Sequence, residues 1–466
     1  MFHESSTTED SSAETATKTS RNPYAVVYSI PGAKNFSISG AFARFPMSMV
    51  GIGIILMIEV LYNSYALGGK VSAAYVIAQA ICSPQIAKLV DRYGQARIMR
   101  PFIVVSSLSL SALILAALTH QAHWMLYLFA ILTGATIGAV GAMVRARWSH
   151  VVNNPRDLHT AYSLESAIDE MIFVIGPIAA TVLATSVSPW AGLVVPVVLM
   201  VFGGFWFLAQ KDTEPPIIAP VLGEKVPTVL RNPAVLAVIA VFICTGVIFG
   251  AADVATIAFA EEQGNKGLSG LVLGVFALGS CISGLLYGAR QWGSALWKRF
   301  VVGIVALGVM VCLFFVATNL WMLAATMFLA GFAISPTLIN GNNVIQLVVS
   351  PRQLTEGLTW VGTALGVGVS LGSSVAGVRI DEAGAHSGFS VVVIAGLVQV
   401  VIALVAMRTF RTRTTTHQIQ EVPTVDLLDD ESAVQEATAL SSTIAPASTI
   451  AATDVATDLI NKKYKK

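Results

Sequence analysis

The sequence predicts an all-α membrane protein in which twelve transmembrane helices form two six-helix bundles related by pseudo-symmetry. The first supporting observation is composition: 55% of the 466 residues are hydrophobic and 12% are charged, against roughly 25% charged residues in a typical soluble domain. The second is a series of twelve apolar segments, each long enough to cross a bilayer. The third is a pair of short motifs that recurs in corresponding loops of the two halves.

The twelve segments are expected to be helices, because a helix satisfies its own backbone hydrogen bonds within lipid. They cover approximately residues 37–61, 71–90, 101–119, 124–144, 162–186, 190–210, 234–258, 268–288, 300–318, 321–342, 357–379 and 388–408. The chain is thereby divided into an N-terminal tail (1–35), a first bundle (36–210), a middle loop (211–233), a second bundle (234–410) and a C-terminal tail (411–466). Both tails are polar and are expected to be disordered and cytoplasmic.

Lysine and arginine residues set the expected orientation. There are 19 of them between residues 36 and 410, and 16 fall on the cytoplasmic side if the N-terminus is inside. Positively charged loops remain in the cytoplasm. We therefore expect a multi-pass protein of the plasma membrane with both termini in the cytoplasm.

Composition and motif content exclude several classes of function. So apolar a chain is expected to be neither a soluble enzyme nor a disordered scaffold. Its net charge of +1 gives no reason to expect nucleic acid as a partner. The sequence contains neither a phosphate-binding G-x-x-x-x-G-K-S/T loop nor a zinc-binding H-E-x-x-H pair. We expect no enzymatic activity, no cofactor and no bound metal.

Two loops of the first half have counterparts in the second half. Pro155–Leu158 (PRDL) precedes the fifth span, and Pro351–Leu354 (PRQL) precedes the eleventh. Asp91–Gly94 (DRYG) follows the second span, and Arg290–Gly293 (RQWG) follows the eighth. Two matches at nearly one offset indicate a duplicated six-helix unit, which is typical of secondary transporters.

The two sets of six helices and the DRYG loop resemble the major facilitator superfamily of transporters, in its twelve-helix prokaryotic type. Asp91, Arg92 and Gly94 match the loop signature of that family, and Arg97 follows the position of its basic pair. The resemblance implies that this loop is a gating latch whose aspartate engages the start of the eleventh helix. The alternative is a solvated loop that only sets the orientation.

Gly176-Pro177 in the fifth span is similar to a signature of the drug/proton antiporters of that superfamily. The match is partial, because Ala180 and Thr181 replace two glycines of the full pattern. In addition, Ala130 stands where those antiporters carry an arginine. Export in exchange for protons is implied by this resemblance alone.

Three carboxylates lie within the fifth span, where a charge is costly. Glu165 and Asp169 are four residues apart and share a helix face, whereas Glu170 is rotated by about 100° from Asp169. We interpret Asp169 and Glu170 as candidates for proton or substrate coupling. The alternative is a structural cluster in which Arg145 and Arg147, at the end of the fourth span, form ion pairs with Glu165 or Asp169.

Glu59 and Asp253 lie in the first and seventh spans, which correspond in the repeat. Each is a further coupling candidate or a contact for a cationic substrate; the alternative is an acid near the interface that reaches water. Arg44, in the first span, is expected to extend to the interface. Asn340, Asn343 and Trp360 are candidates for lining a cavity, although the asparagines can also hydrate a helix end and the tryptophan can simply pack.

Together these features predict a secondary active transporter that works by alternating access and exports a small organic molecule against protons. One alternative is a sugar or metabolite carrier that acts as an importer. Another is a non-transporting membrane sensor or scaffold. The expected partners are a small-molecule substrate, protons and the lipid bilayer, and the chain is expected to be a monomer.

Overall fold

The computed structural model describes residues 22–217 and 228–420. Residues 1–414 form one compact unit, to which all the contacts below belong, and residues 415–466 form another. Within the described ranges, twelve helical segments are long and apolar enough to cross a membrane, so the predicted all-α membrane fold is confirmed.

A short helix, α1 (Pro23–Tyr28), precedes the first bundle. The first bundle contains α2 (Ala33–Tyr62), α3 (Tyr65–Tyr93), α4 (Gln95–Leu118), α5 (His123–Thr136), α6 (Val140–Val151), α7 (Pro155–Ser186) and α8 (Ala191–Ala209). The second contains α9 (Pro233–Glu262), α10 (Ser269–Ala289), α11 (Leu296–Cys312), α12 (Leu320–Val348), α13 (Leu354–Ala383) and α14 (Ala385–Gln420). Short 3₁₀ segments lie at Val229–Arg231, Lys266–Leu268, Leu313–Val316 and Pro351–Gln353.

Local sequence explains where several helices begin and break. Asn154 caps α7 by accepting a hydrogen bond from the backbone N–H of Arg156, and Pro155 occupies the first helical position. The fourth span is divided into α5 and α6 at Gly138, whose φ of +69° interrupts the helix. The break sets the N-terminus of α6 about one and a half turns before Arg145.

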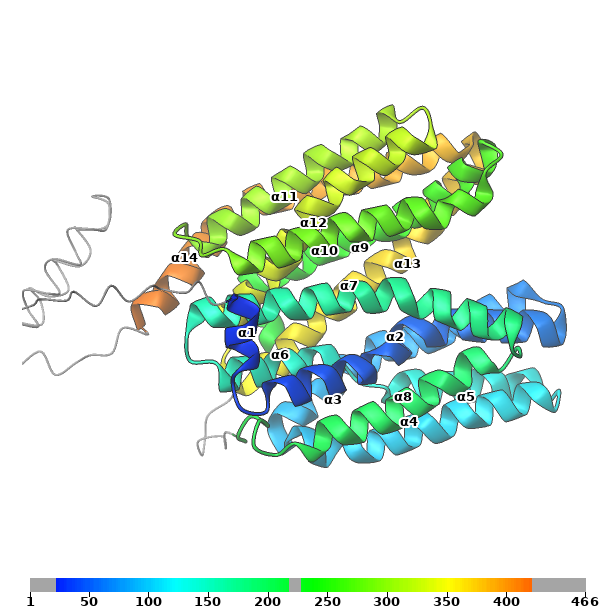
Figure 1. Ribbon diagram of the computed structural model, residues 1–466, viewed down its shortest axis with the longest axis horizontal. Helices are drawn as coiled ribbons and strands as arrows, with labels where there is room; N and C mark the ends of the chain where they lie inside the picture. The colour runs from blue at the N-terminus through cyan, green and yellow to red at the C-terminus, as the bar shows by residue number, and fades with distance from the viewer. Residues whose placement is uncertain (1–21, 218–227, 421–466) are drawn as a thin grey trace, which may run out of the picture. The chain divides into compact units, whose positions relative to one another are not determined.

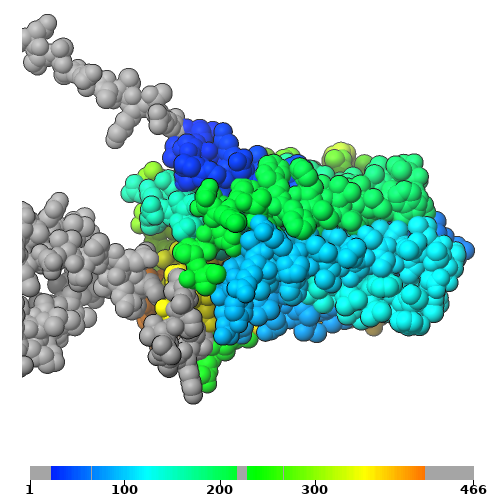
Figure 2. All heavy atoms as spheres, turned by 90° about the horizontal axis from the view of Figure 1, so that it is seen from below, coloured from blue at the N-terminus to red at the C-terminus, as the bar shows by residue number. Residues whose placement is uncertain are grey.

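Each bundle buries its own apolar core and exposes apolar side chains on its outer face. The core of the first bundle includes Tyr75, Leu113 and Phe207. Figure 2 looks onto this bundle from the side of α4. The apolar residues Leu108 and Leu115 of α4 are exposed. An apolar surface of this kind suits contact with lipid rather than with water.

The two bundles approach each other at one end, here called the tail end, where α2 begins and α3 ends. Figure 1 shows their helices close together at this end and separated toward the opposite end. Ala142 and Ala146 of α6 belong to the same buried apolar cluster as Leu354 and Leu358 of α13. The tail end is therefore sealed by apolar packing between the bundles.

The structure differs from the expected tail at residues 1–35. Residues 23–28 form α1, and the first span already begins at Ala33. Asn22 caps α1 by accepting from the backbone N–H of Tyr24, and Val27 is fully buried against the first bundle. Likewise α14 continues to Gln420, beyond the expected end of the second bundle. Residues 1–21 and 421–466, and part of the middle loop (218–227), lie outside the described residues.

Candidate functional site

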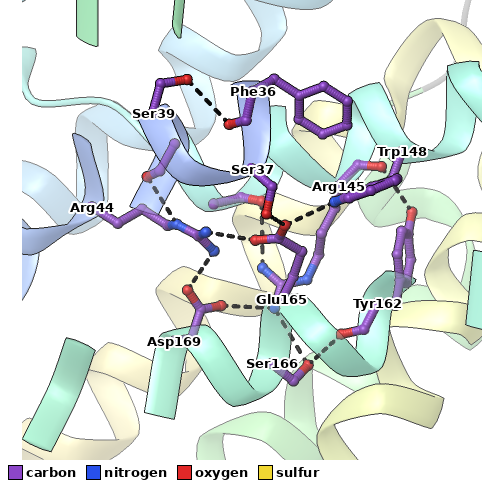
Figure 3. Close-up of polar contacts among 12 residues, drawn as sticks. Phe36, Ser37, Ser39, Arg44, Arg145, Trp148, Tyr162, Glu165, Ser166 and Asp169 are labelled. Atoms are coloured by element: carbon purple, nitrogen blue, oxygen red, sulfur yellow. Dashed lines mark hydrogen bonds and ion pairs between the residues drawn. The ribbon is translucent and has the colours of Figure 1, made fainter. Parts of the chain in front are cut away.

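A cluster of buried charges in the first bundle, here called the charged site, is built around Arg44 of α2 (Figure 3). Its Nη2 lies 2.5 Å from Glu165 Oε2, and its Nη1 lies 2.6 Å from Asp169 Oδ1. The side chain of Arg44 is 1% exposed and that of Glu165 is 0% exposed. The prediction that Arg44 extends to the interface is therefore wrong: the two carboxylates of α7 hold it inside the bundle.

Asp169 is shared between two arginines. Its second oxygen, Oδ2, accepts from Nη2 of Arg145 at 2.7 Å. Gly141 lies one turn before Arg145, and a Cβ there would make ordinary van der Waals contacts, 3.5 Å from Arg145 Nη1 and 3.5 Å from Arg44 Cδ. The site thus contains two positive and two negative groups, an arrangement that compensates their burial.

Neutral donors complete the shell of Glu165. Ser37 Oγ and Trp148 Nε1 both donate to Glu165 Oε1, at 2.6 and 2.8 Å. Sequence analysis missed Ser37, Trp148 and the role of Arg44. The spacing of Glu165 and Asp169 could only indicate that a cation faces them, because it does not identify which neighbouring helix supplies it.

Arg147 does not join the predicted ion-pair cluster with Glu165 and Asp169. Its Nε donates to Gln95 Oε1 and its Nη1 to the carbonyl of Gln210, both at 2.8 Å. Its guanidinium also stacks over Phe207, 3.9 Å from the ring centroid. Residues 145 and 147 are two positions apart and so point to different sides of α6. Arg145 therefore joins Asp169, whereas Arg147 fastens α6 to α4 and α8.

Glu170 projects from α7 in another direction than Asp169. It occupies the middle of α7, is half-buried, and has Ser280 of α10 and Asp253 of α9 as neighbours from the second bundle. Asp253 is exposed. Within the described residues, no ion pair joins Glu170 or Asp253 to a basic side chain. Glu59 is half-buried near the C-terminal end of α2.

The DRYG loop makes the first contact that closes the tail end. Asp91 Oδ2 accepts from the backbone N–H of Glu356 at 2.8 Å, and Oδ1 accepts from that of Thr355 at 3.2 Å. These amides belong to the first turn of α13, where an anion is favoured by the free N–H groups and the helix dipole. Lys88 adds an ion pair with Glu356 at 3.3 Å.

The other residues of the loop have separate positions. Gly94 ends α3 with a φ of +93°, which favours glycine. Arg92 lies over the ring of Tyr93, 5.1 Å from its centroid. Arg97 is exposed on α4. Of the four predicted latch residues, only Asp91 contacts the second bundle through a described hydrogen bond.

Replacing Asp91 by asparagine is expected to open the tail end. The neutral side chain keeps one acceptor and loses the charge that binds two backbone N–H groups, so the open fraction should rise roughly tenfold. Labelling of a cysteine placed at Ala87 by a reagent on the tail side measures this. Asp157→Asn, in the first turn of α7, is the matched control. Equal labelling of Asp91→Asn and the parent would contradict the prediction.

The candidates on α12 and α13 also lie toward the tail end. Asn340 Nδ2 donates to the hydroxyl of Tyr287 at 2.9 Å, and Asn343 Nδ2 donates to His159 Nδ1 at 3.1 Å. His159 belongs to α7, so Asn343 bridges the two bundles. Trp360 is half-buried on α13. In this conformer, both asparagines are engaged by protein partners.

Comparison with known proteins was made on sequence and on structure. A family model described as Major Facilitator Superfamily matches residues 36–297 and 254–452. No curated protein matches the chain. The human organic anion transporter MFSD10 (TETRAN) has a similar structure, with a TM-score of 0.60 and 13% identity over 83% of this chain and 99% of that chain.

A bacterial homologue of the iron transporter ferroportin is similar as well. Its outward-facing structure gives a TM-score of 0.62, and its outward-facing structure with soaked iron gives 0.63. In both cases the identity is 14%, and the match covers 82% of this chain and 99% of that chain. At identities this low, the structural similarity establishes a shared fold and nothing more.

Proposed function

Since the chain belongs to the Major Facilitator Superfamily, and is a multi-pass membrane transporter rather than an enzyme, we propose that it moves a small organic molecule by alternating access in exchange for protons. Export is the proposed direction. The observation that carries the proposal is the pair Glu170 and Asp253, two carboxylates without a basic partner in the described residues, one on each bundle. Ionisable groups at such depth mark a transport pathway.

The conformer supports alternating access. The tail end is sealed by apolar packing and by the Asp91 contact, while the helices separate toward the opposite end (Figure 1). The excess of lysine and arginine in the tail-end loops supports a cytoplasmic location for this end. The separated ends of the helices would then lie on the outer side of the membrane, and the chain shares its fold with an outward-facing ferroportin homologue.

Protonation of Asp169 would change the contacts between helices of the first bundle. As a carboxylate it accepts from Arg44 on α2 and from Arg145 on α6. Protonation would remove its charge and release the hold on one arginine, which changes the packing of α2 and α6 against α7. Proton binding at Glu170 or Asp253 would instead remove like charges that face each other across the bundles.

The alternative of a sugar or metabolite carrier has less support. It requires Asn340 and Asn343 to be available for substrate hydroxyl groups, and both bind protein partners in this conformer.

The test is flux in proteoliposomes. A substrate screen under an imposed proton gradient first identifies a transported compound. Glu170→Gln and Asp253→Asn should then each reduce gradient-driven flux by at least tenfold, because a neutral amide cannot carry the proton. Glu382→Gln, at a side chain that is 60% exposed, is the matched control. Full gradient-driven flux in both the Glu170→Gln and the Asp253→Asn variant would refute the coupling role.

A further inference from the structure

A second contact closes the tail end through the last turns of α10. The final carbonyl groups of a helix have no partner within it. Here Thr160 Oγ1 of α7 donates to the carbonyl of Gly288 at 2.8 Å, and His159 Nε2 lies 3.4 Å from the carbonyl of Tyr287. The hydroxyl of Tyr24, on α1, donates to the carbonyl of Leu285, which lies one turn before the last residue of α10 and can also accept a hydrogen bond within the helix. These three donors come from outside the second bundle, and the carbonyl of Tyr287 also accepts from Trp292 Nε1 of the second bundle at 3.0 Å.

The approach at this point is close. A Cβ on Gly288 would lie 2.2 Å from Ser163 Cβ and 3.0 Å from the hydroxyl oxygen of Tyr24. Position 288 therefore requires glycine for α10 to meet both α7 and α1. The contact is made by backbone and hydroxyl groups with little freedom to rearrange, so it forms only when the bundles are closed here.

Helix α1 is anchored in the first bundle while Tyr24 reaches into the second. Val27 is fully buried in the first-bundle core, and the hydroxyl oxygen of Tyr28 lies 3.4 Å from Ser37 Oγ. Ser37 in turn donates to Glu165 of the charged site. The residues before the first span are thus packed between the charged site and the closing surface.

We infer that α1 and the beginning of α7 form a second closure contact, in which Tyr24, His159 and Thr160 bind the C-terminal carbonyls of α10. It complements the Asp91 contact electrostatically. Asp91 places an anion at the N-terminus of α13, and the second contact places hydrogen donors at the negative end of α10. The chain before the first span is therefore a gating element of the transporter.

The protonation states of two donors agree with this assignment. Burial raises the pKa of Tyr24 to about 12, so its hydroxyl keeps the donated proton throughout the physiological range. The amide of Asn343 donates to Nδ1 of His159, which leaves the proton of a neutral imidazole on Nε2, facing the Tyr287 carbonyl.

Tyr24→Phe is the decisive variant, because it removes one hydroxyl and keeps the ring. Spin labels on exposed loop residues 153 and 291, on either side of the contact, report the distance between bundles at the tail end by double electron–electron resonance. We expect the ratio of open to closed populations to rise about fivefold, as for the loss of one hydrogen bond. Thr160→Val should give a similar shift.

Tyr28→Phe is the matched control, since it makes the same change on the same helix where the hydroxyl contacts only the first bundle. Its distance distribution should equal that of the parent. An Asp91→Asn background, in which the first contact is weakened, makes a small shift easier to resolve. In that background, identical distributions for Tyr24→Phe, Tyr28→Phe and the unmodified tyrosines would overturn the inference.

Deletion provides an independent measurement. Removing residues 1–32 should raise the open population, whereas removing residues 1–21 should not, because α1 remains. A closed distribution after removal of residues 1–32 would also overturn the inference. The distance measurements require neither substrate nor a proton gradient. Their outcome therefore tests the closure contact independently of the proposed proton coupling.

Discussion

Replacing Arg44 by methionine should reduce stability more than other single charge deletions in the first bundle. Glu165 would be left fully buried without its cation, and Asp169 would retain Arg145 alone. Breaking a buried ion pair by removing one partner costs about 3–5 kcal/mol. We expect a much lower thermal midpoint and a reduced yield of monodisperse protein, measured by thermal unfolding and size-exclusion chromatography.

Two further variants separate charge loss from side-chain truncation. Arg379→Met also removes an ion-paired arginine, but its side chain is 51% exposed, and such surface pairs contribute about 0–1 kcal/mol. Glu165→Gln combined with Arg44→Met removes both charges and should recover part of the loss, because the amide can still accept from Ser37 and Trp148. A thermal midpoint for Arg44→Met equal to that of Arg379→Met would contradict the ion-pair interpretation.

The fold was predictable because apolar length is a local property of sequence. Each predicted segment overlaps one of the twelve spans among the described residues. Asp91 was placed at the start of the eleventh span by a family motif, and the structure puts it beside the amides of Thr355 and Glu356. The partners within the charged site could not be predicted in the same way. The spacing of Glu165 and Asp169 along α7 indicates a shared face, but it does not identify the helix that packs against this face.

The N-terminal helix α1 shows that average composition can miss a short helix. Residues 1–35 are polar on average, and this average predicted a tail. A local signal was present: Asn22 followed by Pro23 is a typical helix start, since asparagine caps and proline occupies the first position. The cross-bundle bond of Tyr24 had no sequence signal, because it depends on where α10 ends in space.

Helices α9 and α13 pack closely along one side, where glycines of one helix face backbone atoms of the other. A Cβ on Gly246 would lie 2.1 Å from the carbonyl oxygen of Leu365, and a Cβ on Gly372 would lie 2.3 Å from that of Val247. The obstacles are backbone atoms, which cannot turn aside as a side chain can. Gly362 and Gly366 of α13 differ, because nothing lies within 4 Å of a Cβ at either position. The glycines of α13 therefore lie on two different faces: Gly372 lies on the face that packs against α9, and Gly362 and Gly366 lie on an open face.

Substitution of these glycines by alanine should give effects of opposite sign. Gly246→Ala forces α9 away from α13 and should cost about 3 kcal/mol, as overpacking does in a dense core. Gly366→Ala adds a methyl group in open space and should stabilise the helix by about 0.5–1 kcal/mol, because alanine has less backbone freedom to lose. Thermal unfolding of the two purified variants measures both. If Gly246→Ala were as stable as Gly366→Ala, the close approach of α9 and α13 would not be required for the fold of the second bundle.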